Sequence, residues 1–100
     1  MNDYTFSKLA ESDLQAILDY TVDKWGGEQA EIYLDGLVDC FKRIAKAPDL
    51  GRECDGLRTG MRRIEYGKHV VFFRRTRSGI RIGRVLHQKI LPSRHWFEGS

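Results

Sequence analysis

The residues of this 100-residue chain that are best suited to chemistry are basic, and they lie in its second half. Guanidinium groups bind phosphate or carboxylate through paired hydrogen bonds, and an imidazole transfers protons near neutral pH. The side chains of these two kinds that fall close together are Arg62, Arg63, Arg74, Arg75, Arg81, Arg84 and His87. One hypothesis is a surface that binds an acidic partner. Another is an RNA-cleaving site in which arginines hold the phosphate and His87 moves a proton. A third interpretation is that these charges only keep a small sheet soluble.

The charge is distributed unevenly along the chain. Residues 1–50 contain 5 Lys and Arg against 10 Asp and Glu, whereas residues 51–100 contain 12 against 4, and the net charge is +3. Ten of the eleven arginines lie after position 50. A positive surface attracts nucleic acids and acidic proteins alike, so we expect the second half to bind one of them.

The motifs of nucleotide, metal and disulfide sites are missing from the sequence. Gly26-Gly27 lacks the spacing of a phosphate-binding loop and the Lys-Ser/Thr that would follow it. His69, His87 and His95 are too far apart in the sequence to suggest a metal site, and two cysteines are too few for a disulfide framework. We therefore expect no cofactor and no bound metal.

No segment has the character of a membrane span or a signal peptide. The longest unbroken apolar run, residues 70–73, is far shorter than the roughly 20 residues of a membrane helix. Residues 1–4 offer neither a basic start nor an apolar stretch. The sequence therefore predicts a soluble, cytoplasmic protein folded as one domain over residues 1–100.

The first half of the chain predicts a short strand followed by two helices. Residues 3–6 alternate polar and apolar as in a strand, and Ser7 is a good N-cap for the helix that follows. Two helical stripes come next: Ala10, Leu14, Ile17, Leu18, Thr21 and Trp25, then Ala30, Tyr33, Leu34, Leu37, Val38, Phe41, Ile44 and Ala45. Because Gly26-Gly27 separates them and Pro48 limits the second, we expect an antiparallel helical hairpin.

The second half predicts a small antiparallel sheet. After a loop over residues 48–60, the apolar period changes to two, with strands over 62–66, 69–75 and 80–87 and tight turns between them. The tail, residues 88–100, is expected to be irregular or a short helix. The order β-α-α-β-β-β is typical of an α+β fold in which the helical hairpin packs on one face of the sheet. The strand register, and with it the faces that Arg62, Arg74 and Arg84 occupy, stays open.

Residues from about position 4 to 96 match the pattern of one bacterial protein family. The matching residues are, in order, Ser7, Ala10, Asp13, Leu14, Ile17, Tyr20, Trp25, Gly26, Ala30, Tyr33, Leu37, Pro48 and Gly51, then Leu57-Arg58, Gly60-Met61-Arg62-Arg63, Gly67, His69 to Arg74, and Ile82 to Gln88. No single match is specific. Together, in this order and spacing, they make the chain resemble the toxins of the ParE branch of the RelE/ParE superfamily, which belong to bacterial type II toxin–antitoxin pairs.

The resemblance implies the fold just described and a protein that acts by binding. Toxins of this kind bind DNA gyrase and trap it with cleaved DNA, which stops replication without catalysis by the toxin. The residues of the last strand and tail that we expect to contact gyrase are Arg84, His87, Lys89, Arg94, His95 and Trp96.

The resemblance also implies a ParD-like antitoxin that wraps the toxin with its C-terminal segment, in a hetero-oligomer that we expect to be a heterotetramer or larger. The antitoxin's N-terminal part binds operator DNA, so the toxin would meet that DNA only indirectly. We expect an acidic wrapping segment, with apolar side chains on the helical hairpin and carboxylates on the arginine-rich strands. The residues predicted to receive it are Tyr20, Trp25, Tyr33, Arg62, Arg74, Arg75 and Arg81.

Other members of the superfamily cleave ribosome-bound mRNA with basic and aromatic residues on the same sheet. The residues that could take that place here are Arg62, Arg74, Arg84 and His87. However, Gln88 follows His87, and no tyrosine comes after Tyr66. Because a missing acid–base or stacking group removes much of the rate, the sequence favours a toxin without catalytic residues over an endoribonuclease. A protein that retains only antitoxin binding is the remaining alternative.

Overall fold

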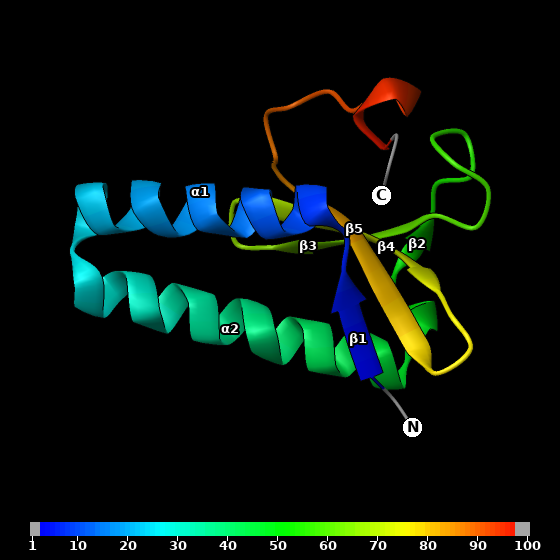
Figure 1. Ribbon diagram of the computed structural model, residues 1–100, viewed down its shortest axis with the longest axis horizontal. Helices are drawn as coiled ribbons and strands as arrows, with labels where there is room; N and C mark the ends of the chain where they lie inside the picture. Colours follow the sequence, from blue (N-terminus) through cyan, green and yellow to red (C-terminus); the bar gives the residue numbers. More distant parts are fainter. Residues whose placement is uncertain (1–2, 98–100) are drawn as a thin grey trace.

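The computed structural model describes residues 3–97 and contains a helical hairpin, a five-stranded sheet and two short 3-10 helices (Figure 1). Along the chain, the elements are β1 (Asp3–Phe6), α1 (Lys8–Trp25), α2 (Gly27–Lys46), η1 (Pro48–Leu50), β2 (Arg52–Glu53), β3 (Arg62–Tyr66), β4 (His69–Arg75), β5 (Gly79–His87) and η2 (Arg94–Phe97). The predicted β-α-α-β-β-β order is confirmed, and the segment predicted as a loop also contains η1 and the two-residue strand β2.

The two helices begin and end where their capping residues predict. The Ser7 hydroxyl oxygen accepts a hydrogen bond from the backbone N–H of Ala10 at 3.0 Å, and the hydroxyl donates to the Gly83 carbonyl at 2.7 Å. This side chain therefore both caps α1 and fixes its start against β5. Gly26 separates α1 from α2 with φ = 90°, a conformation that glycine adopts without steric cost. No helix in the described residues is long and apolar enough to span a bilayer.

The strands lie in the order β1-β5-β4-β3-β2. All neighbours are antiparallel except β1 and β5, which pair in parallel from Asp3↔Gly79 to Phe6↔Ile82. The sheet is therefore mixed, whereas the sequence predicted an antiparallel one. The reason is the long connection after β1, because the helical hairpin and three further strands intervene before β5 comes to lie beside it.

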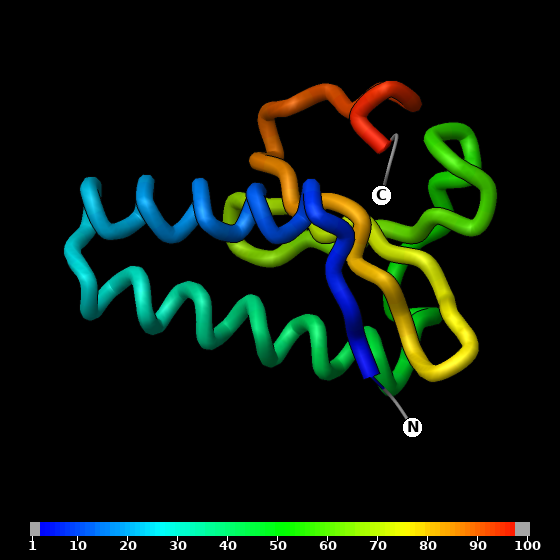
Figure 2. Tube along the Cα trace, viewed as in Figure 1, coloured from blue at the N-terminus to red at the C-terminus, as the bar shows by residue number. Residues whose placement is uncertain are grey.

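Both faces of the sheet are covered. The helical hairpin packs on one face around Phe41, Ile44, Val71, Phe73 and Ile82, all of which are buried. On the other face, Met61, Val70, Phe72 and Leu86 pack against Phe97 of the tail. Figure 2 traces this tail from the end of β5 to η2, where it lies close to the loop between β2 and β3. We call these faces the hairpin face and the tail face.

Candidate functional site

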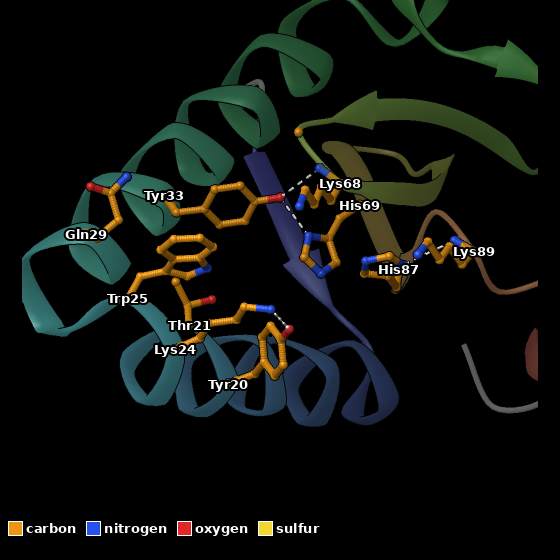
Figure 3. A pocket seen from close by; sticks show the side chains of 11 residues that line it. Tyr20, Thr21, Lys24, Trp25, Gln29, Tyr33, Lys68, His69, His87 and Lys89 are labelled. Atoms are coloured by element: carbon orange, nitrogen blue, oxygen red, sulfur yellow. Dashed lines mark hydrogen bonds between the residues drawn. The ribbon is translucent and has the colours of Figure 1, made fainter.

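An open groove of about 730 Å³ lies between the helical hairpin, the β3–β4 turn and the end of β5. Its lining is rich in aromatic and basic side chains, which Figure 3 shows converging from the two helices and the strand ends. These side chains are Tyr20, Trp25, Tyr33, Lys24, Lys68, Lys89, His69 and His87. We call this site the aromatic–basic groove. It joins the three aromatic residues predicted for antitoxin binding to two of the residues predicted for gyrase binding, His87 and Lys89.

The base of the groove is organised around the phenolic oxygen of Tyr33. This oxygen lies 2.6 Å from Nδ1 of His69, 3.2 Å from the Tyr66 carbonyl and 3.3 Å from the Lys68 backbone N–H. All three contacts are satisfied together when Nδ1 of His69 carries a proton and donates it to Tyr33, while the Tyr33 hydroxyl donates to the Tyr66 carbonyl. In that arrangement, Nε2 of His69 is left as a hydrogen-bond acceptor.

Burial shifts the pKa values of Tyr33 and His69. It raises the pKa of Tyr33, an effect that the hydrogen bond from the Lys68 backbone partly offsets. Burial also lowers the pKa of His69 below its ordinary value of 6.5, and the nearby His87 lowers this pKa further. His69 is therefore neutral at pH 7 and acts as a hydrogen-bonding group rather than a cation.

His69 and His87 lie directly opposite each other on β4 and β5, and their ring centroids are 5.5 Å apart. The backbone N–H of Lys89 donates to Nδ1 of His87 at 3.2 Å, so a neutral His87 carries its proton on Nε2. The structure thus brings together two histidines that are widely separated in the sequence. His95 lies on η2, outside the groove, and no cluster of three His, Cys, Asp or Glu suitable for a metal occurs within residues 3–97.

The outer wall of the groove is exposed and aromatic. Tyr20 and Trp25 are each 59% exposed, and Lys24 lies between them on α1. The Lys24 ammonium donates to the Tyr20 hydroxyl at 3.2 Å and is 5.7 Å from the Trp25 ring centroid. Trp25 ends the helical stripe of α1, and the end of the helical hairpin that carries it extends beyond the sheet (Figure 1), so the ring stays accessible.

Gly67 is needed for this geometry. It occupies the β3–β4 turn with φ = 55°, and an added Cβ would lie 2.7 Å from the Tyr33 hydroxyl oxygen. A side chain at this position would therefore be strained and would displace Tyr33 from the hydrogen bonds described above.

The predicted arginines are divided between the two faces of the sheet. Directly opposed residues in an antiparallel pair share a face. Arg62 lies opposite Phe73 on the hairpin face, whereas Arg84 lies opposite Phe72 on the tail face. Arg74, next to Phe73 on β4, alternates onto the tail face. Arg62 and Arg74 line one pocket at the strand ends, but Arg84 and His87 are not part of it, so the four residues do not converge on one site.

Arg62 and Arg75 are held by the protein itself. Both pair with Asp49 of η1, at 3.5 and 2.8 Å, and Arg62 also donates to the Gly51 carbonyl at 2.7 Å. These contacts fix the start of the β2 segment against the sheet. Arg62 and Arg75, which the sequence predicted to bind carboxylates of the antitoxin, therefore form ion pairs within this chain.

Arg84 is likewise part of the fold. Its Nε and Nη2 each donate to a carboxylate oxygen of Asp13 at 2.8 Å, and the two side chains are only 12% and 13% exposed. Nη1 of Arg84 donates to the Trp96 carbonyl at 2.8 Å, and the guanidinium lies 5.2 Å from the Trp96 ring centroid. Arg84 thus connects α1, β5 and the half-buried Trp96, whereas Arg94 and His95 are exposed on η2.

Sequence reasoning missed Lys24, Lys68 and His69 as members of the groove. His69 was part of the recognised family pattern, but its role depends on register, because Tyr33 and His87 meet it only in the folded chain. The exposed lysines carried no signal in the sequence beyond their charge.

Comparison with known proteins agrees with this fold. Residues 4–92 match the family described as ParE toxin of type II toxin-antitoxin system, parDE. The protein named Toxin ParE1 of Mycobacterium tuberculosis is 43% identical over 88 residues, which cover 87% of this chain and 90% of the relative. Toxin ParE1 of Caulobacter vibrioides is 39% identical over 97 residues, covering 95% of this chain and 98% of the relative.

A solved structure supports the fold independently. The structure titled "Chromosomal ParDE TA system from P. aeruginosa" aligns with a TM-score of 0.71 and 24% identity, covering 85% of this chain and 94% of that chain. Because the family pattern, the curated relatives and the fold agree over most of the length, this chain belongs to the ParE toxin family of type II toxin–antitoxin systems.

Proposed function

We propose that this ParE-family toxin inhibits DNA gyrase in the cytoplasm by binding it, breaks no bond itself, and is neutralised by a ParD-like antitoxin. The observation that carries this proposal is the aromatic–basic groove, an open surface with exposed rings beside cationic side chains. Exposed aromatic residues are the usual anchors of protein–protein interfaces, and nearby charges set the choice of partner.

The antitoxin's wrapping segment would occupy this groove. Its apolar side chains would pack on Tyr20, Trp25 and Tyr33, and its carboxylates would meet Lys68 and Lys89. This modifies the expectation from the sequence, because lysines rather than arginines supply the charges beside the aromatic rings. We expect the assembly to be a heterotetramer or larger, with sequence-specific contacts to operator DNA made by the antitoxin.

Gyrase would be met by the same end of the molecule and the adjoining tail. His87 and Lys89 line the groove, and Arg94 and His95 are exposed on η2. Arg84 would act indirectly, by holding the tail through the Trp96 carbonyl. An antitoxin in the groove would cover His87 and Lys89, so neutralisation would follow from occlusion of part of the gyrase-binding surface.

The endoribonuclease alternative has less support from the geometry. Arg62 and Arg84 are engaged in internal ion pairs on opposite faces of the sheet, and Arg74 is separated from His87 along the strands. General acid–base catalysis requires groups within hydrogen-bond reach of one substrate, which this arrangement does not offer.

Supercoiling and cleavage assays with purified gyrase test the proposal, run beside mRNA integrity in a translating extract. We expect loss of supercoiling and accumulation of cleaved DNA, with transcripts intact. Cleaved transcripts with undisturbed gyrase would establish the endoribonuclease instead. No effect in either assay, with antitoxin binding retained, would indicate a protein that only binds its antitoxin.

A further inference from the structure

Two arginines face each other at the end of the sheet that is remote from the groove. Arg74 of β4 lies directly opposite Arg81 of β5, on the tail face and next to the β4–β5 turn. The groove lies at the other end of the same two strands, where His69 opposes His87. Arg74 lies five positions after His69 along the extended strand, about 17 Å away at the usual rise. The two sites can therefore be occupied at the same time.

This arginine pair has no acidic partner within residues 3–97. The carboxylates that share a pocket with Arg74 are used elsewhere, because Glu53 pairs with Arg62 and Asp55 accepts a hydrogen bond from the Gly60 backbone N–H. Asp49 pairs with Arg75 and Arg62. Like charges directly opposed across strands destabilise a sheet. Partial burial lowers the pKa of Arg74, and the nearby Arg58 and Arg81 lower this pKa further. The fold thus maintains a local concentration of positive charge at a cost in stability, which a bound anion would relieve.

The surroundings of the pair indicate what kind of anion fits. From Arg74 to Arg81, the exposed or half-exposed side chains are those of arginine, threonine and serine, and the one apolar residue, Ile80, is buried. Interfaces with protein partners have aromatic or aliphatic anchors at their centre, and residues 74–81 around the β4–β5 turn expose no such side chain. Contacts to a sugar–phosphate backbone need only cations and hydroxyl or amide donors.

We propose that Arg74 and Arg81 bind the phosphodiester backbone of a nucleic acid. Figure 1 shows the β4–β5 turn at the opposite side of the molecule from the α1–α2 connection, so this contact would leave the groove open for a protein partner. The contact goes beyond the proposed inhibition of gyrase, because it gives the toxin a direct attachment to nucleic acid without sequence readout. It also assigns Arg74 and Arg81 to a partner other than the antitoxin.

The test is fluorescence anisotropy of the full-length chain with a labelled DNA duplex and, in a second arm, a labelled single-stranded RNA. Arg74→Gln/Arg81→Gln is compared with Lys68→Gln/Lys89→Gln, which removes the same charge from the groove. On duplex DNA, each phosphate contact contributes about −0.9 to the slope of log K against the logarithm of the salt concentration. When two contacts are lost, the factor by which the affinity decreases between about 50 and 200 mM salt is about tenfold smaller. We expect this change for the arginine variant, a smaller one for the lysine variant, and near wild-type behaviour for Arg74→Lys/Arg81→Lys. The arm that shows the effect identifies the nucleic acid.

Affinity for the cognate antitoxin, measured on the same variants, distinguishes this proposal from the proposed function. The arginine variant should bind the antitoxin as wild type does, and the lysine variant should bind it more weakly. Equal nucleic-acid binding by the arginine variant and wild type, or an equal loss in both double variants, would overturn the proposal. So would a loss of antitoxin affinity in the arginine variant, which would indicate an acidic segment of that protein as the true ligand.

Discussion

The phenolic oxygen of Tyr33 lies 2.6 Å from Nδ1 of His69 and joins the first half of α2 to the start of β4. The same oxygen contacts the backbone of the β3–β4 turn at Tyr66 and Lys68. A single hydroxyl therefore fixes helix, turn and strand relative to one another at the base of the groove. The shape of the proposed binding surface depends on this contact.

Tyr33→Phe removes these hydrogen bonds and leaves the ring in place. We expect the free energy of unfolding to fall by about 1 to 2 kcal/mol, because Nδ1 of His69 and the backbone groups of Tyr66 and Lys68 lose their hydrogen bonds to the hydroxyl. Denaturant unfolding measures the change. Tyr20→Phe is the matched control, since within residues 3–97 the exposed Tyr20 hydroxyl bonds only to Lys24, and its loss should cost less than about 0.5 kcal/mol. Equal losses in the two variants would contradict the assigned role of Tyr33.

The lowered pKa of His69 predicts that the protein loses stability in mild acid. An unfolded His69 has its ordinary pKa of 6.5, whereas burial and His87 lower the pKa in the folded state. As the pH falls, the unfolded chain takes up the proton first, so the free energy of unfolding decreases from about pH 7 towards pH 5 and this contribution levels off below the folded pKa. Denaturant unfolding across this pH range measures it.

His69→Asn keeps a donor near Tyr33 and removes the titrating group, so its stability should depend less on pH. The control is His95→Gln, which alters an exposed imidazole and should leave the pH dependence unchanged. Parallel curves for wild type and His69→Asn would show that His69 does not carry the effect.

The Asp13–Arg84 pair predicts a large cost when only one partner is removed. Asp13→Asn leaves a guanidinium that is 12% exposed without its counter-charge, at a cost of about 3 kcal/mol. Arg52→Gln breaks the exposed pair with Glu65 and should cost less than about 1 kcal/mol. Thermal or denaturant unfolding compares the two, and a similar small loss in both would mean that the buried pair contributes little.

The Arg74–Arg81 repulsion predicts a stabilising substitution. Arg81→Glu converts opposed like charges into an ion pair across the strands and should raise the free energy of unfolding by about 0.5 to 1 kcal/mol. Arg94→Glu makes the same charge change on exposed η2 and should have little effect. If Arg81→Glu lowers the stability, the two guanidinium groups do not repel each other in the folded protein.

Much of the fold could be predicted because local patterns specify it. Ser7 and Gly26 mark helix ends through their capping chemistry. The change to a period of two, the apolar centre of residues 69–75 and the turn at Gly67-Lys68 predicted the bounds of β3 and β4 to the residue. The parallel pairing of β1 with β5 was not predictable from such patterns, since it depends on where a strand returns after 70 intervening residues or more. β2 was not predicted because a strand of two residues is too short to show an alternation of apolar and polar residues.

The site was harder to predict because it depends on long-range contacts. Tyr20, Trp25 and Tyr33 were identified from their family pattern, and the structure places all three at one groove. The contacts of His69 with Tyr33 and His87 depend on register, and Asp13 meets Arg84 across 71 positions of sequence. The faces of the arginines follow from the register as well, which the alternation of residues along one strand does not determine.

The central claim, that the aromatic–basic groove binds the antitoxin, is tested most directly by the Kd of the cognate antitoxin for Trp25→Ala. The account predicts that this variant binds at least about 30-fold more weakly, the loss expected of an aromatic anchor worth about 2 kcal/mol. Leu50→Ala, which trims an equally accessible apolar side chain on η1, should bind as wild type does. An unchanged Kd for Trp25→Ala, in a variant that folds normally, would contradict the account.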